Sequence, residues 1–254
     1  MQSFYIHITD NILNLIIDIG NNSSKFFLFQ GDAIILKGRR ENTALNFIAD
    51  IAKEYEVKNI IVSSVVEFKE EDKEKLFAEY PDTIWFTSAT PLPINILYRT
   101  PQKLGSDRLA AAIGAISEAP GKDILIIDAG SAITIDFVDA QGNFLGGNIS
   151  PGIKMRLTAL HQFTSKLPQV EKEGETPAIG YDTETAIRCG VIWGVCHEID
   201  GYINYFRQKY PDLLVFLTGG DEKALIGKIK NRIFADKFLV AKGLNRILTE
   251  NDSK

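Results

Sequence analysis

The sequence predicts an α/β protein made of two duplicated domains, each with a mixed β-sheet flanked by helices. Short apolar runs typical of buried strands alternate with stretches in which apolar residues recur at helical spacing. The phrase Leu-Ile-Ile-Asp-x-Gly occurs twice, at residues 15–20 and 125–130, with an offset of 110 residues. Each copy is followed by a second apolar arm that ends in a glycine turn. The repeat indicates that one β-hairpin unit occurs twice in the chain.

The first half is expected to open on a hairpin and to continue with alternating helices and strands. Residues 1–14 carry no clear pattern, and residues 91–102, with three prolines, are predicted to be irregular. Pro81 ends one helix, because proline lacks the N–H that a helix interior needs. The predicted elements are strands at 15–17, 25–30 and 33–38, a helix at 42–55, a strand at 59–66, a helix at 70–80, a strand at 83–86 and a helix from about 108 to 118.

The second half starts after the turn at 120–122, so we predict domains at 1–119 and 120–254. Its hairpin begins with the buried run 124–127. The glycine-rich segment 146–152 is interpreted as a turn leading into a helix, with Pro151 near the helix start. The remaining predicted elements are a polar loop at 166–178, a long helix at 183–209, a strand at 213–218, a short helix, a strand at 238–240 and a final helix at 243–248.

The composition is that of an ordinary globular protein and excludes several classes of function. The 254 residues are 45% hydrophobic and 24% charged, and the net charge of −5 argues against non-specific nucleic-acid binding. No apolar run approaches the ~20 residues of a membrane span, and the first residues lack the pattern of a signal peptide. Cys189 and Cys196 lie in a helical pattern at about 10 Å along the axis, too far apart for a disulfide. We expect a cytoplasmic protein with two packed thiols.

Several common catalytic motifs are missing from the sequence. It has neither the G-x-x-x-x-G-K-[ST] phosphate loop nor the G-x-G-x-x-G dinucleotide motif. It also lacks a G-x-S-x-G elbow and a Ser-His-Asp order typical of hydrolases. The chain is therefore not expected to be a P-loop NTPase, a Rossmann dehydrogenase or a serine hydrolase.

Two acidic turns are the strongest candidate functional feature. Asp18 and Asp128 each end a buried apolar strand, and each lies two residues before a glycine, in the pattern Asp-x-Gly. A backbone bent at glycine brings N–H groups close to phosphate oxygens, and a carboxylate can hold a cation against them. Aspartate beside glycine is also common in ordinary turns. The second copy favours phosphate or cation binding, with polar donors at 21–24 in the first turn and Ser131 in the second.

Asp107 and Arg108 lie at the start of a predicted helix and have two interpretations. Ser106 or Asp107 can be the N-cap, with Arg108 on a solvated face. Alternatively, the helix N-terminus and Arg108 attract an anion while Asp107 accepts a proton from a hydroxyl. The spacing leaves both interpretations open.

Other conspicuous positions have structural interpretations as well. Asp182 or Thr183 can cap the long helix, Tyr98 can be a packing residue in a proline-rich loop, and Thr218-Gly219-Gly220 can be a plain strand-to-helix turn. Gly190 and Gly194 favour helix packing, in the core or in a dimer, over a ligand site.

The duplicated hairpin is the plan of the actin-like ATPases, which have a ribonuclease H-like fold. In that plan a cleft separates the two copies, and two acidic turns face each other across the nucleotide phosphates. This likeness concerns the fold, and a fold alone does not give a function.

The motifs, taken in order, resemble those of the type III pantothenate kinases. The order and spacing agree from Leu15 to the C-terminal helix, which is nearly the whole chain, and as a set the motifs are highly specific. The motifs are Asp18-Ile-Gly-Asn21, Tyr98, Gly105-Ser-Asp-Arg108, Asp128-Ala-Gly-Ser-Ala-Ile-Thr-Ile-Asp136, Gly146-Gly-Asn-Ile-Ser-Pro-Gly152, Leu167-Pro168, Gly180-Tyr-Asp-Thr183-Glu-Thr-Ala-Ile187 and Thr218-Gly-Gly220.

The resemblance implies transfer of the ATP γ-phosphoryl group to the primary hydroxyl of pantothenate, the first step of coenzyme A synthesis. It implies that Asp107 is the general base and that Asp128 binds a monovalent cation, K⁺ or NH₄⁺. Family members are homodimers with the substrate pocket at the interface, and they need a divalent cation such as Mg²⁺ with ATP. The implied ATP contacts are Asp18, Ile19, Gly20, Asn21, Asn22, Ser23, Ser24, Lys25 and Ser131. The implied pantothenate contacts are Tyr98, Gly105, Ser106, Asp107, Arg108 and Thr183.

The chain departs from the family pattern at two positions. Asn22 and Ser131 stand where the family has Thr; Ser131 keeps the hydroxyl, and Asn22 keeps a donor with a different reach. The changed first turn leaves open a regulatory or accessory protein on the same fold without kinase activity. The intact acidic residues and Arg108 argue against that alternative. An actin-like kinase for another small hydroxy acid or for a sugar is the other alternative.

Overall fold

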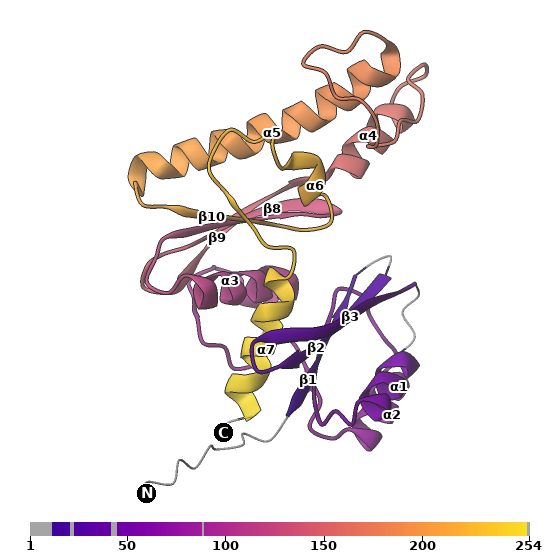
Figure 1. The fold of residues 1–254 in the computed structure, drawn as a ribbon, viewed down its shortest axis with the longest axis vertical. Helices are drawn as coiled ribbons and strands as arrows, with labels where there is room; N and C mark the ends of the chain where they lie inside the picture. The colour runs from indigo at the N-terminus through magenta and orange to yellow at the C-terminus, as the bar shows by residue number, and fades with distance from the viewer. Residues whose placement is uncertain (1–11, 21–22, 42–44, 88, 253–254) are drawn as a thin grey trace, which may run out of the picture. The chain divides into compact units, whose positions relative to one another are not determined.

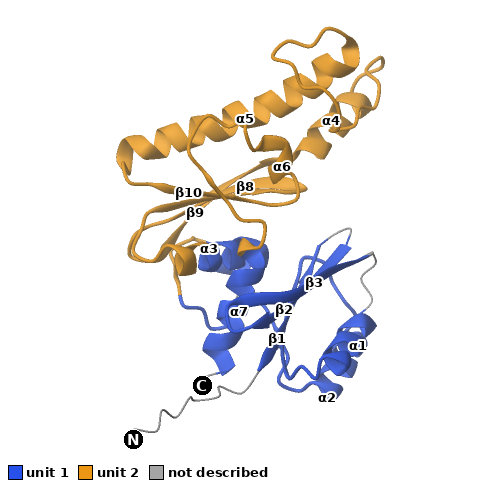
Figure 2. Ribbon diagram, in the orientation of Figure 1, with its two compact units in different colours: residues 1–93, 100–114, 240–254 blue, residues 94–99, 115–239 orange. Residues whose placement is uncertain are grey.

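The computed structural model describes residues 12–20, 23–41, 45–87 and 89–252 (Figure 1). The chain forms two compact units, which Figure 2 shows in different colours. Unit 1 is drawn from residues 1–93, 100–114 and 240–254, and unit 2 from residues 94–99 and 115–239. The division at residues 119 and 120 remains a prediction about the duplicated sequence. The compact units differ from it in that each takes short segments from both halves of the chain.

Unit 1 contains a mixed five-stranded sheet in the order β3-β2-β1-β4-β5. β1 pairs with β2 as an antiparallel hairpin and with β4 in parallel, so β1 is central. Its apolar residues are buried on both faces, as the predicted strand required. The strands are β1 (Leu13–Ile19), β2 (Ser23–Gln30), β3 (Ala33–Glu41), β4 (Asn59–Ser64) and β5 (Ile84–Trp85).

Helices pack against the two faces of this sheet. On one face, Leu15, Ile17 and Ile19 of β1 join the apolar sides of α1 (Asn46–Glu54) and α2 (Glu70–Glu79) in one buried cluster. Alternate residues of a strand point to opposite faces. Asn14 accordingly faces the other side, where its Nδ2 donates a 2.8 Å hydrogen bond to Oδ1 of Asn245.

Asn245 belongs to α7 (Leu239–Asp252), which packs closely on α3 (Ser106–Glu118). Gly243 of α7 is buried and lies against the backbone of α3, because a Cβ built there would collide with the carbonyl oxygen of Ala110. The contact needs a glycine, since any side chain would push the two helices apart.

Unit 2 contains a mixed six-stranded sheet in the order β11-β10-β7-β8-β9-β6. β7 is central and pairs with β8 in an antiparallel hairpin and with β10 in parallel. The strands are β6 (Asn95–Ile96), β7 (Ile124–Ala129), β8 (Ala132–Val138), β9 (Asn143–Pro151), β10 (Leu214–Thr218) and β11 (Phe234–Ala235). A short 3-10 turn, η1 (Pro101–Lys103), precedes α3.

One face of the unit 2 sheet is covered by α4 (Ile153–Gln162), α5 (Thr183–Lys209) and α6 (Glu222–Leu225). Figure 1 shows α5 as a long helix above the strands of this sheet. Leu125 and Ile127 of β7 share a buried cluster with Ile192 and Val195 of α5. Near the end of α5, Phe206 stacks on Phe137 of β8 with ring centroids 5.0 Å apart.

The two sheets repeat one topology, which supports the predicted duplication. The order β3-β2-β1-β4-β5 in unit 1 corresponds to β9-β8-β7-β10-β11 in unit 2, with β6 added at the edge. The predicted architecture of two repeated units, each with a mixed sheet flanked by helices, is therefore confirmed.

Most predicted elements are confirmed, including α5 with both of its predicted ends. Two were wrong. Residues 146–151 form the end of strand β9 rather than a turn, and Pro151 ends that strand while Gly152 is the N-cap of α4. Residues 239 and 240 open α7, so no strand lies at 238–240; the strand of this region is β11. Residues 42–44 of the first predicted helix lie outside the described residues.

Cys189 and Cys196 are buried free thiols, as expected from their spacing. Burial raises the pKa of the Cys196 thiol to about 11, which keeps it protonated at neutral pH. Among the described residues, none of the helices has the length and apolar character to cross a membrane.

The contact at Gly243 gives a stability prediction. We expect Gly243→Ala to lower the free energy of unfolding by about 1–3 kcal/mol, because the added methyl group overpacks the junction of α3 and α7. Urea denaturation measures this change. The control is Gly201→Ala on an exposed position of α5, where a Cβ meets open space and the helix gains up to about 1 kcal/mol. A Gly243→Ala protein as stable as the Gly201→Ala protein would contradict the account.

Candidate functional site

The first acidic turn joins β1 to β2 in unit 1. The backbone N–H of Gly20 donates a 3.0 Å hydrogen bond to the carbonyl oxygen of Ser23, which closes the turn. Asp18 lies opposite Lys25 in the hairpin, and Lys25 Nζ is 3.6 Å from Asp18 Oδ2. Ile19 is buried, and the predicted contacts Asn21 and Asn22 lie outside the described residues. The turn thus combines a carboxylate, a cation and a glycine-bent backbone.

The two serines of this turn are buried. Ser23 is 9% exposed and Ser24 is fully buried. The Ser24 Oγ has no hydrogen-bond partner within the described part of the chain. A buried polar group without a partner costs free energy, so this hydroxyl stands out in the turn.

The carboxyl group of Asp18 is held in an unfavourable environment. Burial raises its pKa above the usual aspartate value of 3.8, Lys25 lowers it, and the negative charge of Asp107 raises it further. Both carboxyl groups belong to unit 1, so this repulsion is internal to one compact unit. Two acidic groups of one site are therefore electrostatically coupled.

A serine pair connects the end of β4 to the start of α3. Ser63 of β4 lies opposite Asp18 in the parallel register of β1 and β4 and is 1% exposed. Its Oγ donates a 3.1 Å hydrogen bond to Oγ of Ser106, the first residue of α3. Asp107 is the next residue. The sheet register and this hydrogen bond explain why Asp18 and Asp107 influence each other.

Ser106 and Asp107 are the first two residues of α3, so the interpretation that one of them is the N-cap was wrong. The Oδ1 of Asp107 accepts a 2.8 Å hydrogen bond from the backbone N–H of Arg108. The preceding Gly105 leaves room for this carboxylate, since a Cβ there would lie 2.5 Å from Asp107 Oδ1. The side chain of Arg108 is 6% exposed, so the interpretation that it lies on a solvated face was wrong.

The second acidic turn joins β7 to β8 in unit 2 and repeats the first. The N–H of Gly130 donates a 3.0 Å hydrogen bond to the carbonyl oxygen of Ala132. Asp128 is half-buried and Ser131 is exposed. The turn is one residue shorter than its counterpart in unit 1.

The Thr218-Gly219-Gly220 turn lies beside the second acidic turn. Thr218 is opposite Asp128 in the parallel register of β7 and β10. Gly219 has φ +101°, and a Cβ there would lie 2.5 Å from Asp128 Oδ1. Glycine is required here for two reasons: other residues rarely adopt this backbone conformation, and a Cβ would collide with the carboxylate of Asp128. The carboxylate of Asp128 therefore faces exposed backbone of a neighbouring turn.

Gly152 is a site residue that the sequence reasoning did not single out by itself. Its N–H donates a 3.2 Å hydrogen bond to the carbonyl oxygen of Ser131, and a Cβ there would collide with the carbonyl oxygen of Gly130. The close approach explains the glycine and ties the start of α4 to the second acidic turn. The Gly-Gly-x-Ile-x-Pro-Gly motif was the signal that could have found it.

Tyr98 is partly buried against β9 in unit 2. Its ring meets Phe144 edge-to-face with centroids 6.3 Å apart. Gly146, at φ +131°, lies under the ring, since a Cβ there would be 3.3 Å from Tyr98 Cδ2. The packing interpretation of Tyr98 is thus confirmed, and the half-exposed ring can also contact a ligand.

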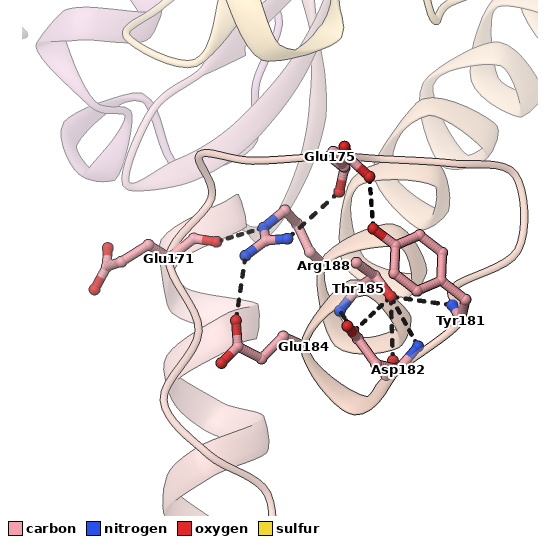
Figure 3. Close-up of polar contacts among 7 residues, drawn as sticks. All are labelled: Glu171, Glu175, Tyr181, Asp182, Glu184, Thr185 and Arg188. Atoms are coloured by element: carbon pink, nitrogen blue, oxygen red, sulfur yellow. Dashed lines mark hydrogen bonds and ion pairs between the residues drawn. The ribbon is translucent and has the colours of Figure 1, made fainter.

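Thr183 is not the N-cap of α5. Asp182 is the cap, and its Oδ1 accepts a 2.8 Å hydrogen bond from the N–H of Thr185 (Figure 3). The Thr185 hydroxyl accepts a 3.1 Å hydrogen bond from the Asp182 N–H in return. The bond from the Thr185 N–H, and a second bond of 2.7 Å from the Thr185 hydroxyl to Asp182 Oδ1, lower the pKa of Asp182. Capping therefore uses the neighbours of Thr183 and leaves Thr183 exposed as the first residue of the helix.

The predicted site residues thus gather into groups within each unit. Unit 1 brings together Asp18, Lys25, Ser106, Asp107 and Arg108, and unit 2 brings Asp128 and Ser131 beside the Thr218-Gly219-Gly220 turn. No group of three or more His, Cys, Asp or Glu side chains suited to a metal occurs in the part of the chain that the structure describes.

Comparison with known proteins decides the family. The type III pantothenate kinase family model matches residues 14–205. The chain belongs to the type III pantothenate kinase family. It is 50% identical over 242 residues to a type III pantothenate kinase of Bacteroides fragilis, covering 95% of this chain and all of the relative. It is 48% identical over 240 residues to that of Phocaeicola vulgatus, covering 94% and 99%.

Solved structures show the fold of this family member. A conserved protein of Campylobacter jejuni assigned to the Baf family of transcriptional activators superposes with a TM-score of 0.62 at 24% identity, covering 94% of this chain and all of that one. A ROK family glucokinase of Streptomyces griseus superposes with a TM-score of 0.56 at 10% identity, covering 94% and 99%. At these identities the likeness concerns the fold alone.

The environment of Asp18 predicts a pH-dependent stability. Because folding raises the pKa of Asp18, protonated Asp18 favours the folded state, and this contribution is lost as the pH rises through the folded pKa. We expect Asp18→Asn to be more stable than the wild type at neutral pH, with the difference shrinking as the pH falls toward 3.8. Urea denaturation without nucleotide, at several pH values, measures it.

The control for that measurement is Asp32→Asn, which removes an exposed carboxylate at the turn between β2 and β3. A difference between the wild type and Asp18→Asn that stays constant with pH, or that grows on acidification, would refute the stated cause.

Proposed function

We propose that this protein transfers the γ-phosphoryl group of ATP to the primary hydroxyl of pantothenate and forms 4′-phosphopantothenate, the first step of coenzyme A synthesis. The observation that carries the proposal is the identity of 50% to a named type III pantothenate kinase over its full length. The two glycine-bent acidic turns at the ends of matching strands support it, because such turns suit the phosphates of a nucleoside triphosphate and their cations.

In the proposed reaction the hydroxyl oxygen of pantothenate attacks the γ-phosphorus. The bond between that phosphorus and the oxygen bridging to ADP breaks, and ADP leaves with the electron pair. The hydroxyl proton passes to the carboxylate of Asp107. Phosphoryl transfer depends mainly on positioning and charge stabilisation, so the base has only to orient and deprotonate the hydroxyl. The bond from Arg108 N to Asp107 Oδ1 holds that carboxylate in place.

The first acidic turn is proposed as the ATP phosphate site. Lys25 supplies a positive charge, Gly20 supplies a bent backbone, and Asp18 can hold the divalent cation that accompanies ATP. A divalent cation held there would neutralise the charge that develops on the transferred phosphoryl group. It would also offset the burial, and the repulsion from Asp107, that raise the pKa of Asp18. The remaining proposed contacts are Ile19, Asn21, Asn22, Ser23, Ser24 and Ser131.

Asp128 is proposed as the ligand of a monovalent cation, K⁺ or NH₄⁺. The carboxylate is half-buried beside the backbone of Gly130 and Gly219. A large monovalent cation suits such a set, because it binds carboxylate and carbonyl oxygens without demanding a close, rigid shell. The neighbouring Thr218-Gly219-Gly220 turn fits an approach to the nucleoside.

Pantothenate is proposed to contact Tyr98, Gly105, Ser106, Asp107, Arg108 and Thr183. Arg108 suits the carboxylate of pantothenate, since guanidinium and carboxylate groups form strong paired hydrogen bonds. Thr183 offers an exposed hydroxyl at the first position of α5.

The proposed assembly is a homodimer formed through α4 and α5. These helices border an apolar groove of about 740 Å³ lined by Met155, Phe163, Val191 and others. Phe163 is 85% exposed, and a Cβ at Gly190 would meet open space. A second copy of the chain can cover this apolar surface. The proposed compartment is the reducing cytoplasm, which suits the free thiols of Cys189 and Cys196.

A coupled ADP-release assay tests the activity against the alternatives. We expect ADP release that requires pantothenate, that is absent with a panel of sugars and other hydroxy acids, and that rises when K⁺ replaces Na⁺. Release with a sugar instead would favour a different actin-like kinase. No ADP release with any acceptor would favour a regulatory protein on this fold and would sink the proposal.

Replacement of the proposed base gives a sharper prediction. Asp107→Asn should fold normally and lower kcat with pantothenate by about 10³-fold, within the range that general bases contribute. Steady-state kinetics measures this, with Asp82→Asn, an exposed position of unit 1, as the matched control. Turnover of Asp107→Asn within a few-fold of the control would show that another group takes the proton.

The proposed interface predicts the oligomeric state of a surface variant. Met155→Glu places a charge in the apolar groove and should convert the dimer into a monomer, because an unpaired charge in an interface is costly. Light scattering after size exclusion measures the mass. Ile35→Glu on β3 is the control, because Ile35 and Met155 are both 50% exposed. A Met155→Glu protein that stays dimeric would place the interface elsewhere.

A further inference from the structure

The segment that joins α4 to α5 is long and has neither helix nor strand between Gln162 and Thr183. Loops of this length are usually functional when they are ordered. Backbone carbonyl groups in such a segment need hydrogen-bond partners from elsewhere. Side chains of α5, the helix that the segment leads into, are partners for carbonyl groups between residues 171 and 177, and His161 of α4 is the partner of the Leu167 carbonyl.

Arg188 on α5 is the principal partner. It is 8% exposed, and its Nε donates a 2.9 Å hydrogen bond to the carbonyl oxygen of Glu171. Its Nη1 donates to the carbonyl oxygen of Glu175 at 3.4 Å. Figure 3 shows the guanidinium between these two backbone positions. One side chain thus holds both ends of a five-residue stretch of the loop.

The loop is shaped to receive this guanidinium. Gly174 has φ +125°, and a Cβ there would lie 2.9 Å from Arg188 Cζ and 3.0 Å from Nη1. The loop backbone can approach the guanidinium this closely only because residue 174 is a glycine. Arg188 is therefore packed into the loop as well as hydrogen-bonded to it.

The ion pair of Arg188 is the lesser part of its environment. Its Nη2 is 4.0 Å from Glu184 Oε2, and the Glu184 side chain is 68% exposed. An exposed pair at that distance stabilises a protein by about 0–1 kcal/mol. A buried guanidinium needs its donors satisfied, and here the backbone carbonyl groups do so.

Two other contacts anchor the same loop independently of Arg188. Trp193 Nε1 donates a 3.1 Å hydrogen bond to the carbonyl oxygen of Pro177. Lys172 pairs with Asp221, which follows the Thr218-Gly219-Gly220 turn. These contacts would keep the loop attached when Arg188 is replaced, so a variant should be locally altered rather than unfolded.

Glu175 connects Arg188 to the start of α5. The carbonyl oxygen of Glu175 accepts from Arg188, while its side-chain Oε2 accepts a 2.6 Å hydrogen bond from the Tyr181 hydroxyl. The Tyr181 N–H in turn donates to the Thr185 hydroxyl of the capping box. Thr183 lies between these last two residues. The chain of contacts runs from the guanidinium through Glu175 to the backbone that carries Thr183 (Figure 3).

We propose that Arg188 is a positioning residue for the acceptor substrate: by holding the backbone at Glu171 and Glu175 it fixes the segment that presents Thr183. This inference rests on the proposed pantothenate kinase activity, in which Thr183 contacts pantothenate. Arg188 itself touches no reacting atom. Its loss should therefore weaken the binding of pantothenate while leaving ATP binding and the phosphoryl-transfer step largely unchanged.

The test compares kinetics and loop exchange in four variants. For Arg188→Met we expect KM for pantothenate to rise about tenfold, with kcat and KM for ATP within about twofold of wild type. Arg188→Lys keeps the charge but can reach only one carbonyl, so about a threefold rise is expected. Glu184→Gln, which removes only the exposed pair, and Arg246→Met, an exposed arginine on α7, should match the wild type.

Hydrogen–deuterium exchange separates positioning from a general loss of structure. Peptides covering 171–182 should exchange faster in Arg188→Met than in Glu184→Gln, with the sheet of unit 2 unchanged. Faster exchange with an unchanged KM for pantothenate would overturn the proposal. A fall in kcat accompanied by rises of similar size in both KM values would also overturn it. If Arg188→Met does not fold, the same two measurements on Arg188→Lys decide whether the proposal holds.

The wild type serves as a separate check on the underlying activity. If the wild-type enzyme shows no pantothenate-dependent ADP release, the proposed function fails, and the role of Arg188 toward pantothenate fails with it. That failure is recognisable because it appears in the wild type, before any variant is compared.

Discussion

In each unit, the position of the acidic turn depends on a central strand that is hydrogen-bonded to a neighbouring strand on either side. β1 is held by the antiparallel β2 and the parallel β4, and β7 is held by β8 and β10 in the same way. The carboxyl end of the central strand therefore carries an aspartate whose position is fixed by two neighbours. Asp18 lies opposite Lys25 and Ser63, and Asp128 lies opposite Thr134 and Thr218. A shift of one residue would turn either aspartate to the other face of its sheet.

This arrangement has an energetic cost in unit 1. Burial raises the pKa of Asp18, and repulsion from the carboxyl group of Asp107 raises it further, because Ser63 and Ser106 bring the start of α3 to the end of β4. Functional sites commonly retain such destabilising groups because the chemistry needs them. We propose different tasks for the two carboxylates: Asp18 holds the nucleotide with its cation, and Asp107 receives the proton.

The sequence predicted the features that repeat or have a strong local pattern. The duplicated Leu-Ile-Ile-Asp-x-Gly phrase identified both hairpins, and the apolar spacing over 183–209 identified α5. β9 was missed because glycines at 146 and 147 weaken the strand pattern. In the structure Gly146 lies under the Tyr98 ring, and a Cβ at Gly147 would collide with Asp136. A strand was predicted at 238–240 because a run of three apolar residues is typical of a short strand and also occurs at the start of a buried helix.

Contacts that depend on loop conformation could not be read from the sequence. Arg188 occurs in a helical pattern rich in charged and apolar residues, and nothing in that pattern shows that its donors reach two carbonyl groups of a loop. The burial of Arg108 was missed for a related reason, because the packing around α3 brings together residues distant in sequence. The order of the motifs identified the family, whereas residues that position a loop, such as Arg188, could be identified only from the structure.

The division of tasks between Asp18 and Asp107 is the central claim, and calorimetric titration with MgATP, in the absence of pantothenate, tests it most directly. The account predicts that Asp18→Asn weakens MgATP binding by about tenfold or more, equivalent to about 1.4 kcal/mol, while Asp107→Asn binds MgATP as the wild type does. Loss of MgATP binding in Asp107→Asn, together with normal binding in Asp18→Asn, would contradict it.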